Sequence, residues 1–338
     1  MDKALLEKTA RAMVATGKGL LAADESAGTC EKRFKSVNVP CTEENRRTYR
    51  ELLFTTPGIQ DFISGVILFD ETLRQKTKDG VPFADHLNKL GIIPGIKVDA
   101  GAKALALSEG EQVTEGLDGL RERLKEYFEL GARFAKWRAV INIGKNIPTT
   151  GCIEANAHAL ARYSALCQEA NIVPIVEPEV ILDGDHSIER CLEVTEATQR
   201  ALFSELVKQQ VSLEHVILKA SMVLSGNKAS NRAGVEEVAK QTLLCLKRAV
   251  PAALPGVVFL SGGQSDEEAT AHLDAMNRIG GAPWPLTYSY SRALQAVALK
   301  AWSGKEENWK TAQQAFHHRA KMNSLASQGK WTKEAEKA

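Results

Sequence analysis

Short apolar stretches rich in β-branched residues alternate along this chain with longer segments in which apolar residues recur at helical spacing. This alternation is typical of parallel strands that are joined by helical crossovers. Eight stretches are predicted strands, at residues 18–24, 62–69, 92–98, 133–140, 172–180, 216–223, 256–262 and 285–290. The pattern therefore predicts an α/β protein with a mainly parallel sheet.

The segments between the predicted strands carry signals of helices. Apolar residues follow one helical face at 117–131, 188–206 and 235–246, and the S-D-E-E sequence at 265–268 has the form of a capping box that opens a helix. The charged residues at 43–47 suggest an exposed helix of their own. Most of the crossovers can therefore be helical.

Eight β/α units in about 290 residues fit a TIM (β/α)8 barrel closely. No linker or change of composition marks a domain boundary, which favours a single domain over residues 1–338 that ends, from about residue 305, in a helix and a short tail. A doubly wound open sheet is the alternative, because a strand count does not show closure. That fold would carry a Gly-x-Gly-x-x-Gly turn after an early strand, and the sequence has none.

The balance of charge narrows the range of partners. With 43 basic and 42 acidic residues the net charge is +1, so no overall field attracts nucleic acid or an anionic membrane. No apolar run has the length of a membrane span, and the charged N-terminus does not have the form of a secretory signal. The six cysteines form no Cys-x-x-Cys pair and are expected to be reduced thiols in a cytoplasmic protein.

Polar residues collect where the predicted strands end, which in a barrel is where catalytic groups lie. In strand order they are Asp24 and Glu25, Asp70, Lys97 and Asp99, Lys136 and Arg138, Glu177 and Glu179, Lys219, Ser261 with Gly262 and Gly263, and Ser289 with Ser291 and Arg292. A closed barrel would bring these groups to one mouth.

Three lysines on predicted strands are the sharpest signal among these residues. An ammonium group inside an apolar strand is costly unless it faces a polar cavity. One such lysine is most simply explained by a side chain that reaches water, but Lys97, Lys136 and Lys219 together favour a shared site. Burial and the neighbouring cations would favour the neutral amine of Lys219, which a carbonyl substrate needs for Schiff-base formation.

Carboxylates at the same mouth can move protons. Glu177 and Glu179 have the same orientation on their strand, and Asp24 comes from a distant strand. Carboxylates that face lysines can give and take protons during carbinolamine dehydration and carbon–carbon cleavage. The alternative is an ion-pair network that only compensates the lysine charges.

Two loops have the features of phosphate sites. Ser261–Gly263 and Ser289–Arg292 follow the seventh and eighth predicted strands, where barrels commonly bind phosphate through backbone N–H groups and an arginine. Hydroxyls and cations after the first strand suggest a second phosphate site on the far side of the mouth: Ser26, Thr29, Lys32 and Arg33. A substrate with a phosphate at each end follows.

Two histidine-containing segments are not assigned to the site. The D-G-D-H run at 183–186 has no second histidine at ligand spacing, so we interpret it as a loop and predict no metal. His317 and His318 fall in the C-terminal helix and are expected to be solvated.

The residues between about 5 and 332 resemble the class I fructose-1,6-bisphosphate aldolase family. The resemblance rests on several blocks, which are GKGLLAADES, TEENRR, GVILFDETL, GIKVD, FAKWR, VPIVEPE, DGDH, LK at 218–219, FLSGGQS, SRALQ and LKAW. It implies a TIM barrel, usually a homotetramer, that reversibly cleaves fructose 1,6-bisphosphate to dihydroxyacetone phosphate and glyceraldehyde 3-phosphate. It also implies a covalent lysine imine with no metal and no other cofactor.

The resemblance also implies roles for individual residues. Lys219 corresponds to the Schiff-base lysine and Glu177 to the acid and base that act on the carbinolamine. Asp24 and Lys136 correspond to the groups that manage the C4 hydroxyl proton and its charge, and Glu179 and Arg138 correspond to supporting members. The ketone-side phosphate is bound by the positions of Ser261, Gly262, Arg292 and the backbone of Ser291. The other phosphate is bound by the positions of Ser26, Thr29 and Lys97, with Lys32 and Arg33 nearby.

Three departures from the family pattern bear on these roles. Lys219 is followed by Ala-Ser-Met where Pro-Asn-Met is frequent, and Ser291 stands where glycine is usual. Many members end in a tyrosine that assists proton transfer on the enamine, whereas this sequence ends at Ala338. The alternatives left open are a preference for fructose 1-phosphate or sedoheptulose 1,7-bisphosphate, and a binding scaffold without turnover.

Overall fold

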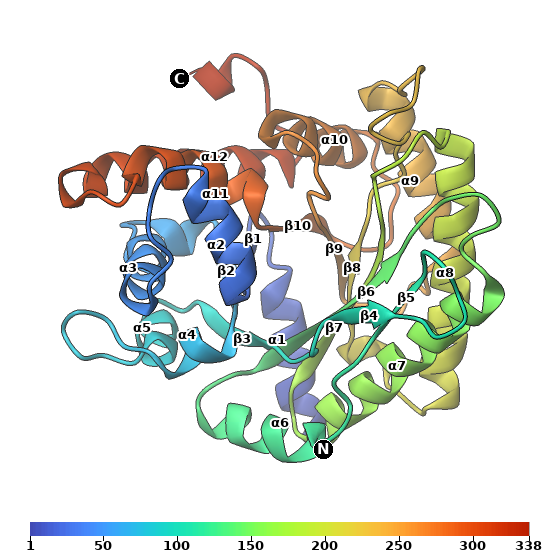
Figure 1. Ribbon diagram of the computed structural model, residues 1–338, viewed down its shortest axis with the longest axis horizontal. Coiled ribbons are helices and arrows are strands. Elements are labelled where there is room, and N and C mark those ends of the chain that lie inside the picture. Colours follow the sequence, from blue (N-terminus) through green and yellow to red (C-terminus); the bar gives the residue numbers. More distant parts are fainter. Residues whose placement is uncertain (338) are drawn as a thin grey trace.

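The computed structural model, which describes residues 1–337, is a closed barrel of parallel strands surrounded by helices (Figure 1). Around the barrel the strands are β1 (Gly19–Ala23), β10 (Leu286–Tyr290), β9 (Gly256–Phe259), β8 (Ile217–Ala220), β7 (Val173–Val180), β6 (Phe134–Ile141), β3 (Ile93–Lys97) and β2 (Ile63–Leu68). The eight predicted strands and the TIM barrel are confirmed. The open sheet is wrong, because β1 pairs with both β2 and β10.

The strand sequences are continuous apolar runs because both faces of the sheet are buried. Side chains that include Leu20, Ile67 and Phe134 fill the inside of the barrel, where α1 (Lys3–Met13) packs against them with Leu6 and Met13. A larger cluster fills the layer between the strands and the outer helices. Polar residues lie at the carboxyl ends of the strands.

One glycine shows how tightly the inside of the barrel is filled. A Cβ atom on Gly95 in β3 would come within 2.2 Å of the ring of Phe134. Because glycine has no Cβ, the Phe134 ring can pack directly against the backbone of β3 at this position.

The outer helices follow the strands in chain order. They are α2 (Ala27–Lys35), α3 (Glu43–Phe54), α4 (Asp70–Arg74), α5 (Phe83–Lys89), α6 (Leu120–Glu129), α7 (Thr150–Glu169), α8 (Ile188–Lys208), α9 (Val235–Ala249), α10 (Asp266–Ile279), α11 (Arg292–Trp302) and α12 (Trp309–Ala326). The helices predicted at 117–131, 188–206 and 235–246 correspond to α6, α8 and α9. The capping box is confirmed, since Ser265 Oγ accepts from Glu268 N–H and Glu268 Oε2 accepts from Ser265 N–H.

Two features differ from the sequence interpretation. A short hairpin of β4 (Ala102–Ala104) and β5 (Gln112–Thr114) lies between β3 and α6 and was not predicted. The helix at 43–47 exists, but α3 continues to Phe54 and its second half is buried, with Arg50 only 2% exposed. The prediction therefore covered only the exposed first half of α3, and tertiary contacts bury the second half together with a charged residue.

The C-terminal segment is folded against α12. The Glu336 carboxylate accepts from Arg319, which is buried between α10, α11 and α12, and from Trp331 Nε1 at 2.8 Å. His318 is half-buried and its Nε2 lies 3.1 Å from Glu336 O, so the expectation of a solvated histidine pair is only partly right. Among the helices of residues 1–337, none is long and apolar enough to cross a membrane.

Candidate active site

A cavity of about 570 Å³ lies at the carboxyl ends of the strands, and residues on or directly after all eight strands line it. Most of the predicted site residues meet here, namely Asp24, Ser26, Thr29, Arg33, Lys97, Lys136, Arg138, Glu177, Glu179, Lys219, Ser261, Gly262, Ser289, Ser291 and Arg292. Residues up to 268 positions apart in the sequence are thus brought to one mouth, as a barrel requires.

Three other residues noted in the sequence do not line this cavity. Lys32 is exposed on α2, and Gly263 is exposed next to the Ser261 loop, where a Cβ on it would be 3.7 Å from Arg292 Nη2. Asp70 instead pairs with Arg74 and accepts a hydrogen bond from Tyr127. The polar residue after the second strand therefore supports α4 and α6 rather than the site.

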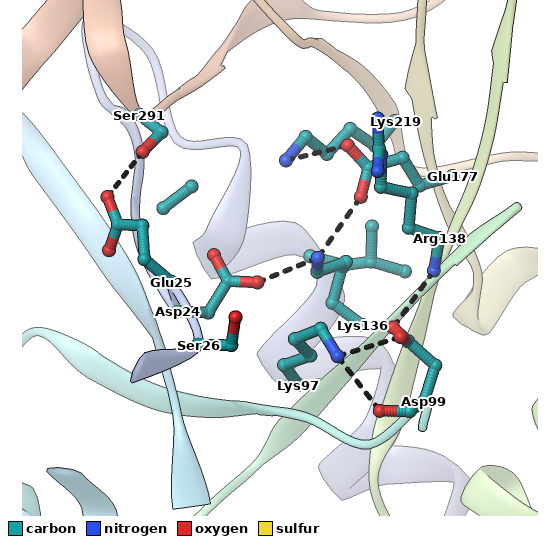
Figure 2. A network of polar contacts seen from close by, with 12 residues as sticks. Asp24, Glu25, Ser26, Lys97, Asp99, Lys136, Arg138, Glu177, Lys219 and Ser291 are labelled. Carbon is teal, nitrogen blue, oxygen red and sulfur yellow. Dashed lines mark hydrogen bonds and ion pairs between the residues drawn. The ribbon is translucent and has the colours of Figure 1, made fainter. Parts of the chain in front are cut away.

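A chain of alternating charges crosses the floor of the cavity (Figure 2). Lys219 Nζ lies 3.0 Å from Glu177 Oε1, and Lys136 Nζ lies 3.4 Å from Glu177 Oε2 and 2.7 Å from Asp24 Oδ2. All four residues are at least nine-tenths buried. The chain joins β8, β7, β6 and the end of β1, so it connects both sides of the barrel.

The protonation states in this chain follow from competition between burial and charge. Burial alone would raise the pKa of Asp24, but Lys136 and Lys219 outweigh it and lower that pKa to about 2. Burial would likewise raise the pKa of Glu177, yet Lys219 and Lys136 hold it below its usual value. The pKa of Lys136 is raised because Asp24 and Glu177 overcome its desolvation. Both carboxylates are therefore ionised and Lys136 is charged.

The Glu177 carboxylate is not fully hydrogen-bonded. Its Oε2 is buried and has Lys136 as an ion-pair neighbour at 3.4 Å, but within residues 1–337 it receives no hydrogen bond. A buried acceptor of this kind costs free energy unless a ligand satisfies it. This oxygen is thus available to a hydroxyl group of a bound substrate.

A second pair of ions lies next to this chain. The guanidinium of Arg138 on β6 donates to Glu179 on β7, and the Arg138 N–H lies 3.3 Å from Asp99 Oδ2. Burial would lower the pKa of Arg138, but Glu179 reverses this and raises it. Glu179 and Arg138 thereby support β6 and β7 at the level of Glu177.

Lys97 is held by a residue to which the sequence interpretation gave no role. Its Nζ donates to the side chain of Asp99 at 2.7 Å and to the Asp99 carbonyl at 2.8 Å (Figure 2). Asp99 Oδ1 also accepts from Gly101 N–H at 3.1 Å. The G-I-K-V-D sequence could have indicated this contact, because an acidic residue two positions after a strand-end lysine can accept a hydrogen bond from the lysine.

On the opposite side of the cavity, hydroxyls and backbone lie ready for an anion. Ser289 Oγ is buried and has no hydrogen-bond partner within the described residues, although Ser289 lines the cavity. Gly262 and Gly263 have φ values of +53° and +89°, which a residue with a side chain adopts only under strain. Ser291 has φ −106°, so serine fits this position without strain, as expected if only its N–H is needed.

Glu25 is the largest omission of the sequence interpretation, which noted it only as a strand-end residue. It lines the cavity, is 9% exposed, and pairs with Arg50 of α3 and Arg33 of α2. The sequence did not show that Arg50 is buried, and it is this buried arginine that pairs with Glu25. Glu25 thus ties the end of β1 to two helices.

Comparison with known proteins bears directly on this site. The family model described as fructose-bisphosphate aldolase class-I matches residues 5–338. The chain belongs to the class I fructose-bisphosphate aldolase family. The resemblance noted in the sequence is thereby confirmed over the length on which it was proposed.

Relatives within the family cover nearly the whole chain. A probable fructose-bisphosphate aldolase class 1 of Xanthomonas campestris is 65% identical over 96% of this chain and 98% of its own length. The cytosolic fructose-bisphosphate aldolase 4 of Arabidopsis thaliana is 55% identical over 95% of this chain and 82% of its own. A solved structure of fructose-bisphosphate aldolase from Plasmodium falciparum superposes with a TM-score of 0.96, with 49% identity and coverage of 97% and 95%.

Proposed function

We propose that this chain reversibly cleaves fructose 1,6-bisphosphate to dihydroxyacetone phosphate and glyceraldehyde 3-phosphate through an imine on Lys219, as an enzyme of glycolysis. The observation that carries the proposal is the buried series Lys219–Glu177–Lys136–Asp24, which crosses a cavity with phosphate-type loops on one side. An ion-pair network with only a structural role would not need to face a cavity of this size.

Imine formation requires a neutral Lys219 amine and a proton for the departing water. Glu177 Oε1 lies 3.0 Å from Lys219 Nζ and can take the ammonium proton. Lys219, Lys136 and Arg138 all lower the pKa of Glu177, and Lys219 has the largest effect of the three. Once Lys219 has lost its charge, that effect is gone, so the carboxyl group holds the proton more firmly. Glu177 then gives the proton to the carbinolamine hydroxyl, and water leaves.

Cleavage between C3 and C4 requires removal of the C4 hydroxyl proton. Asp24 is ionised and Lys136 is charged, so the pair offers an acceptor and a cation 2.7 Å apart. Asp24 accepts the proton, and Lys136 stabilises the negative charge that develops on the C4 oxygen. The imine of Lys219 receives the electron pair of the broken bond as an enamine.

The enamine carbon must then be protonated. Among the described residues that line the cavity, none is a tyrosine. Asp24 holds the proton that it took from the C4 hydroxyl, and Lys136, 2.7 Å from Asp24 and 3.4 Å from Glu177, can relay it to the Glu177 carboxylate. We assign delivery of this proton to the enamine carbon to Glu177, because it lies beside Lys219 and has one oxygen without a hydrogen bond within the described residues. After hydrolysis of the second imine, Lys219 regains its ammonium proton and Glu177 is again a carboxylate, which completes the cycle.

The ends of the substrate have separate contacts in this proposal. Ser261, Gly262, Ser289, Ser291 and Arg292 bind the ketone-side phosphate, and the remaining members of the predicted set, Ser26, Thr29, Lys97 and Arg33, bind the other. Ser26 Oγ and Thr29 Oγ1 lie 3.3 Å apart in the first turn of α2, where backbone N–H groups favour an anion. Lys32 has no place in this arrangement, because it is exposed outside the cavity.

A cleavage assay with an excess of EDTA tests the function. We expect turnover of fructose 1,6-bisphosphate that the chelator does not reduce, and a kcat/KM at least tenfold above that for fructose 1-phosphate, since only the bisphosphate reaches Ser26 and Thr29. Sedoheptulose 1,7-bisphosphate in the same assay tests the remaining alternative. Absence of turnover on all three substrates would support a binding scaffold, and loss of turnover with EDTA would indicate a metal-dependent reaction.

We further propose a homotetramer in the cytoplasm. Relatives include proteins named cytosolic, and the family resemblance supports four subunits. Light scattering on the purified protein should give a mass four times the 36.8 kDa of one chain. A single-chain mass at micromolar concentration would contradict the tetramer.

A further inference from the structure

Ser291 precedes α11, and its hydroxyl does not have the usual role of a serine at this position. An N-cap serine normally accepts a hydrogen bond from an N–H group in the first turn of its helix. Ser291 makes no such bond. Instead its Oγ donates to Glu25 Oε1 at 2.7 Å (Figure 2). The same oxygen accepts from Arg33 Nη1 at 2.9 Å. The hydroxyl therefore links α11 to groups at the other side of the seam between β10 and β1.

The acceptor of this bond is a buried carboxylate with several donors. Glu25 Oε2 accepts from Arg50 at 2.7 Å, and Oε1 accepts from Arg33, Ser291 and, at 3.0 Å, from Gln295. Burial alone would raise the pKa of Glu25, but Arg50 and Arg33 outweigh it and lower that pKa. Glu25 is therefore ionised and has fixed partners on three helices.

The charges in this cluster do not cancel. Arg50 is 3% exposed at its side chain and lies deep between α3 and β1, whereas the Arg33 side chain is 23% exposed and lines the cavity. One carboxylate with two guanidinium groups leaves one positive charge in surplus. Because Arg50 is sealed from solvent, the surplus charge is presented by Arg33 on the cavity side.

The position of Arg33 depends on contacts that the backbone does not supply. β1 and β10 pair only at Leu20 with Ser289 and at Leu21 with Tyr290, so the backbone ladder ends before the mouth. The bonds of Ser291 to Glu25 and Arg33 continue this seam by side chains. The next residue, Arg292, also lines the cavity, which places two guanidinium groups on adjoining parts of its wall.

Resting on the proposed aldolase function, we propose that Ser291 is a positioning residue that holds the Arg33 guanidinium at the cavity wall for the phosphate group that Ser26 and Thr29 also bind. Its hydroxyl fixes the long Arg33 side chain before the anion binds. The conformational entropy of Arg33 is then lost during folding and does not reduce the free energy of phosphate binding. Ser291 thereby sets the affinity for phosphate and not the rate of carbon–carbon cleavage, which belongs to Lys219 and its carboxylate neighbours.

The test compares Ser291→Thr with Ser291→Val, which have the same shape and differ in the hydroxyl. We expect Ser291→Thr to resemble the native chain, and Ser291→Val to raise KM for fructose 1,6-bisphosphate about fivefold to tenfold, as expected for the loss of one intramolecular hydrogen bond. The Kd for inorganic phosphate, measured by titration calorimetry without turnover, should rise by a similar factor. The fall in kcat should be smaller than the rise in KM.

Ser36→Ala is the matched control. It removes a serine hydroxyl that bonds the Arg33 carbonyl at 2.7 Å but not its guanidinium, so both KM and Kd should stay at the native values. Equal values for the Thr and Val variants, or a fall in kcat with no change in KM, would overturn the proposal. If the Val variant does not fold, as judged by circular dichroism, Ser291→Cys replaces it and should weaken phosphate binding while keeping the volume.

The two levels of the proposal fail differently. If the native protein cleaves no ketose phosphate but Ser291→Val still binds phosphate more weakly than the native protein, the aldolase function is overturned and the role of Ser291 stands. Cleavage by the native protein with unchanged phosphate binding in Ser291→Val would overturn the role of Ser291 and leave the function.

Discussion

Replacement of Lys136 by methionine removes the cation between two buried carboxylates. Lys136 lies 2.7 Å from Asp24 and 3.4 Å from Glu177, and is the largest single influence that lowers the pKa of Asp24. Lys219 and Lys97 remain, but burial is the largest influence on Asp24, so without Lys136 we expect its pKa to rise from about 2 past its ordinary value of 3.8. The variant therefore gains a titration in the range where aldol cleavage can be measured.

The magnitude of this linkage follows from the shift. A displacement of the Asp24 pKa from 3.8 to about 2 corresponds to roughly 2 kcal/mol of folding free energy. Because the folded-state pKa is the lower one, this stabilisation is present above pH 4 and is lost as the pH falls toward 2. Removal of one partner of a buried ion pair costs about 3 kcal/mol or more at neutral pH. The variant should therefore melt at a lower temperature and show less loss of stability between pH 4 and pH 2.

Cleavage kinetics between pH 4.5 and pH 8 provide the assay. We expect kcat of Lys136→Met to fall at least a hundredfold, since it loses the cation that stabilises the C4 oxygen. The residual kcat/KM should fall on acidification with an apparent pKa above 3.8, where the native enzyme shows no limb from Asp24. Lys136→Arg keeps the charge and should not gain this acid limb. A variant with kcat within tenfold of native, or with an unchanged pH profile, would refute the role given to Lys136.

Two further predictions concern packing and the phosphate loop. Gly95→Ala places a Cβ within 2.2 Å of the Phe134 ring and should destabilise the fold by about 1–3 kcal/mol in a thermal melt. Gly28→Ala has no atom within 4 Å of the added Cβ and lies in α2, so it should leave the stability unchanged or raise it slightly. Equal melting temperatures for the two variants would contradict the packing argument. Gln264 donates to Ser261 O at 2.8 Å and contacts His272 Nδ1 at 2.6 Å, so Gln264→Leu should raise KM for the bisphosphate about fivefold while leaving the imine chemistry intact, and an unchanged KM would show that the Ser261 loop holds its shape without it.

The barrel was predictable because each strand is buried on both faces and therefore reads as an unbroken apolar run. A lysine within such a run, as at Lys136 or Lys219, was visible against that background and located the site. The two short strands at 102–104 and 112–114 gave no comparable signal, since three residues are too few for a pattern and most are exposed or half-buried.

The errors in the candidate site have physical reasons. Lys32 and Arg33 are neighbours on a helix, so their side chains point about 100° apart, and the sequence does not tell which one faces the mouth. The structure places Arg33 at the cavity and Lys32 in solvent. The buried contact between Glu25 and Arg50 depends on how α3 packs against β1, which the residues around either position do not reveal.

Covalent trapping tests the central claim most directly. Borohydride reduction of the native protein in the presence of dihydroxyacetone phosphate, followed by peptide mass spectrometry, should place one reduced adduct on Lys219 and none on Lys97 or Lys136. The reason is that Glu177, 3.0 Å from Lys219, can take the Lys219 proton, whereas Asp24 and Glu177 together raise the pKa of Lys136 and keep it charged. An adduct on another lysine, or none while the protein still cleaves the bisphosphate, would contradict the account.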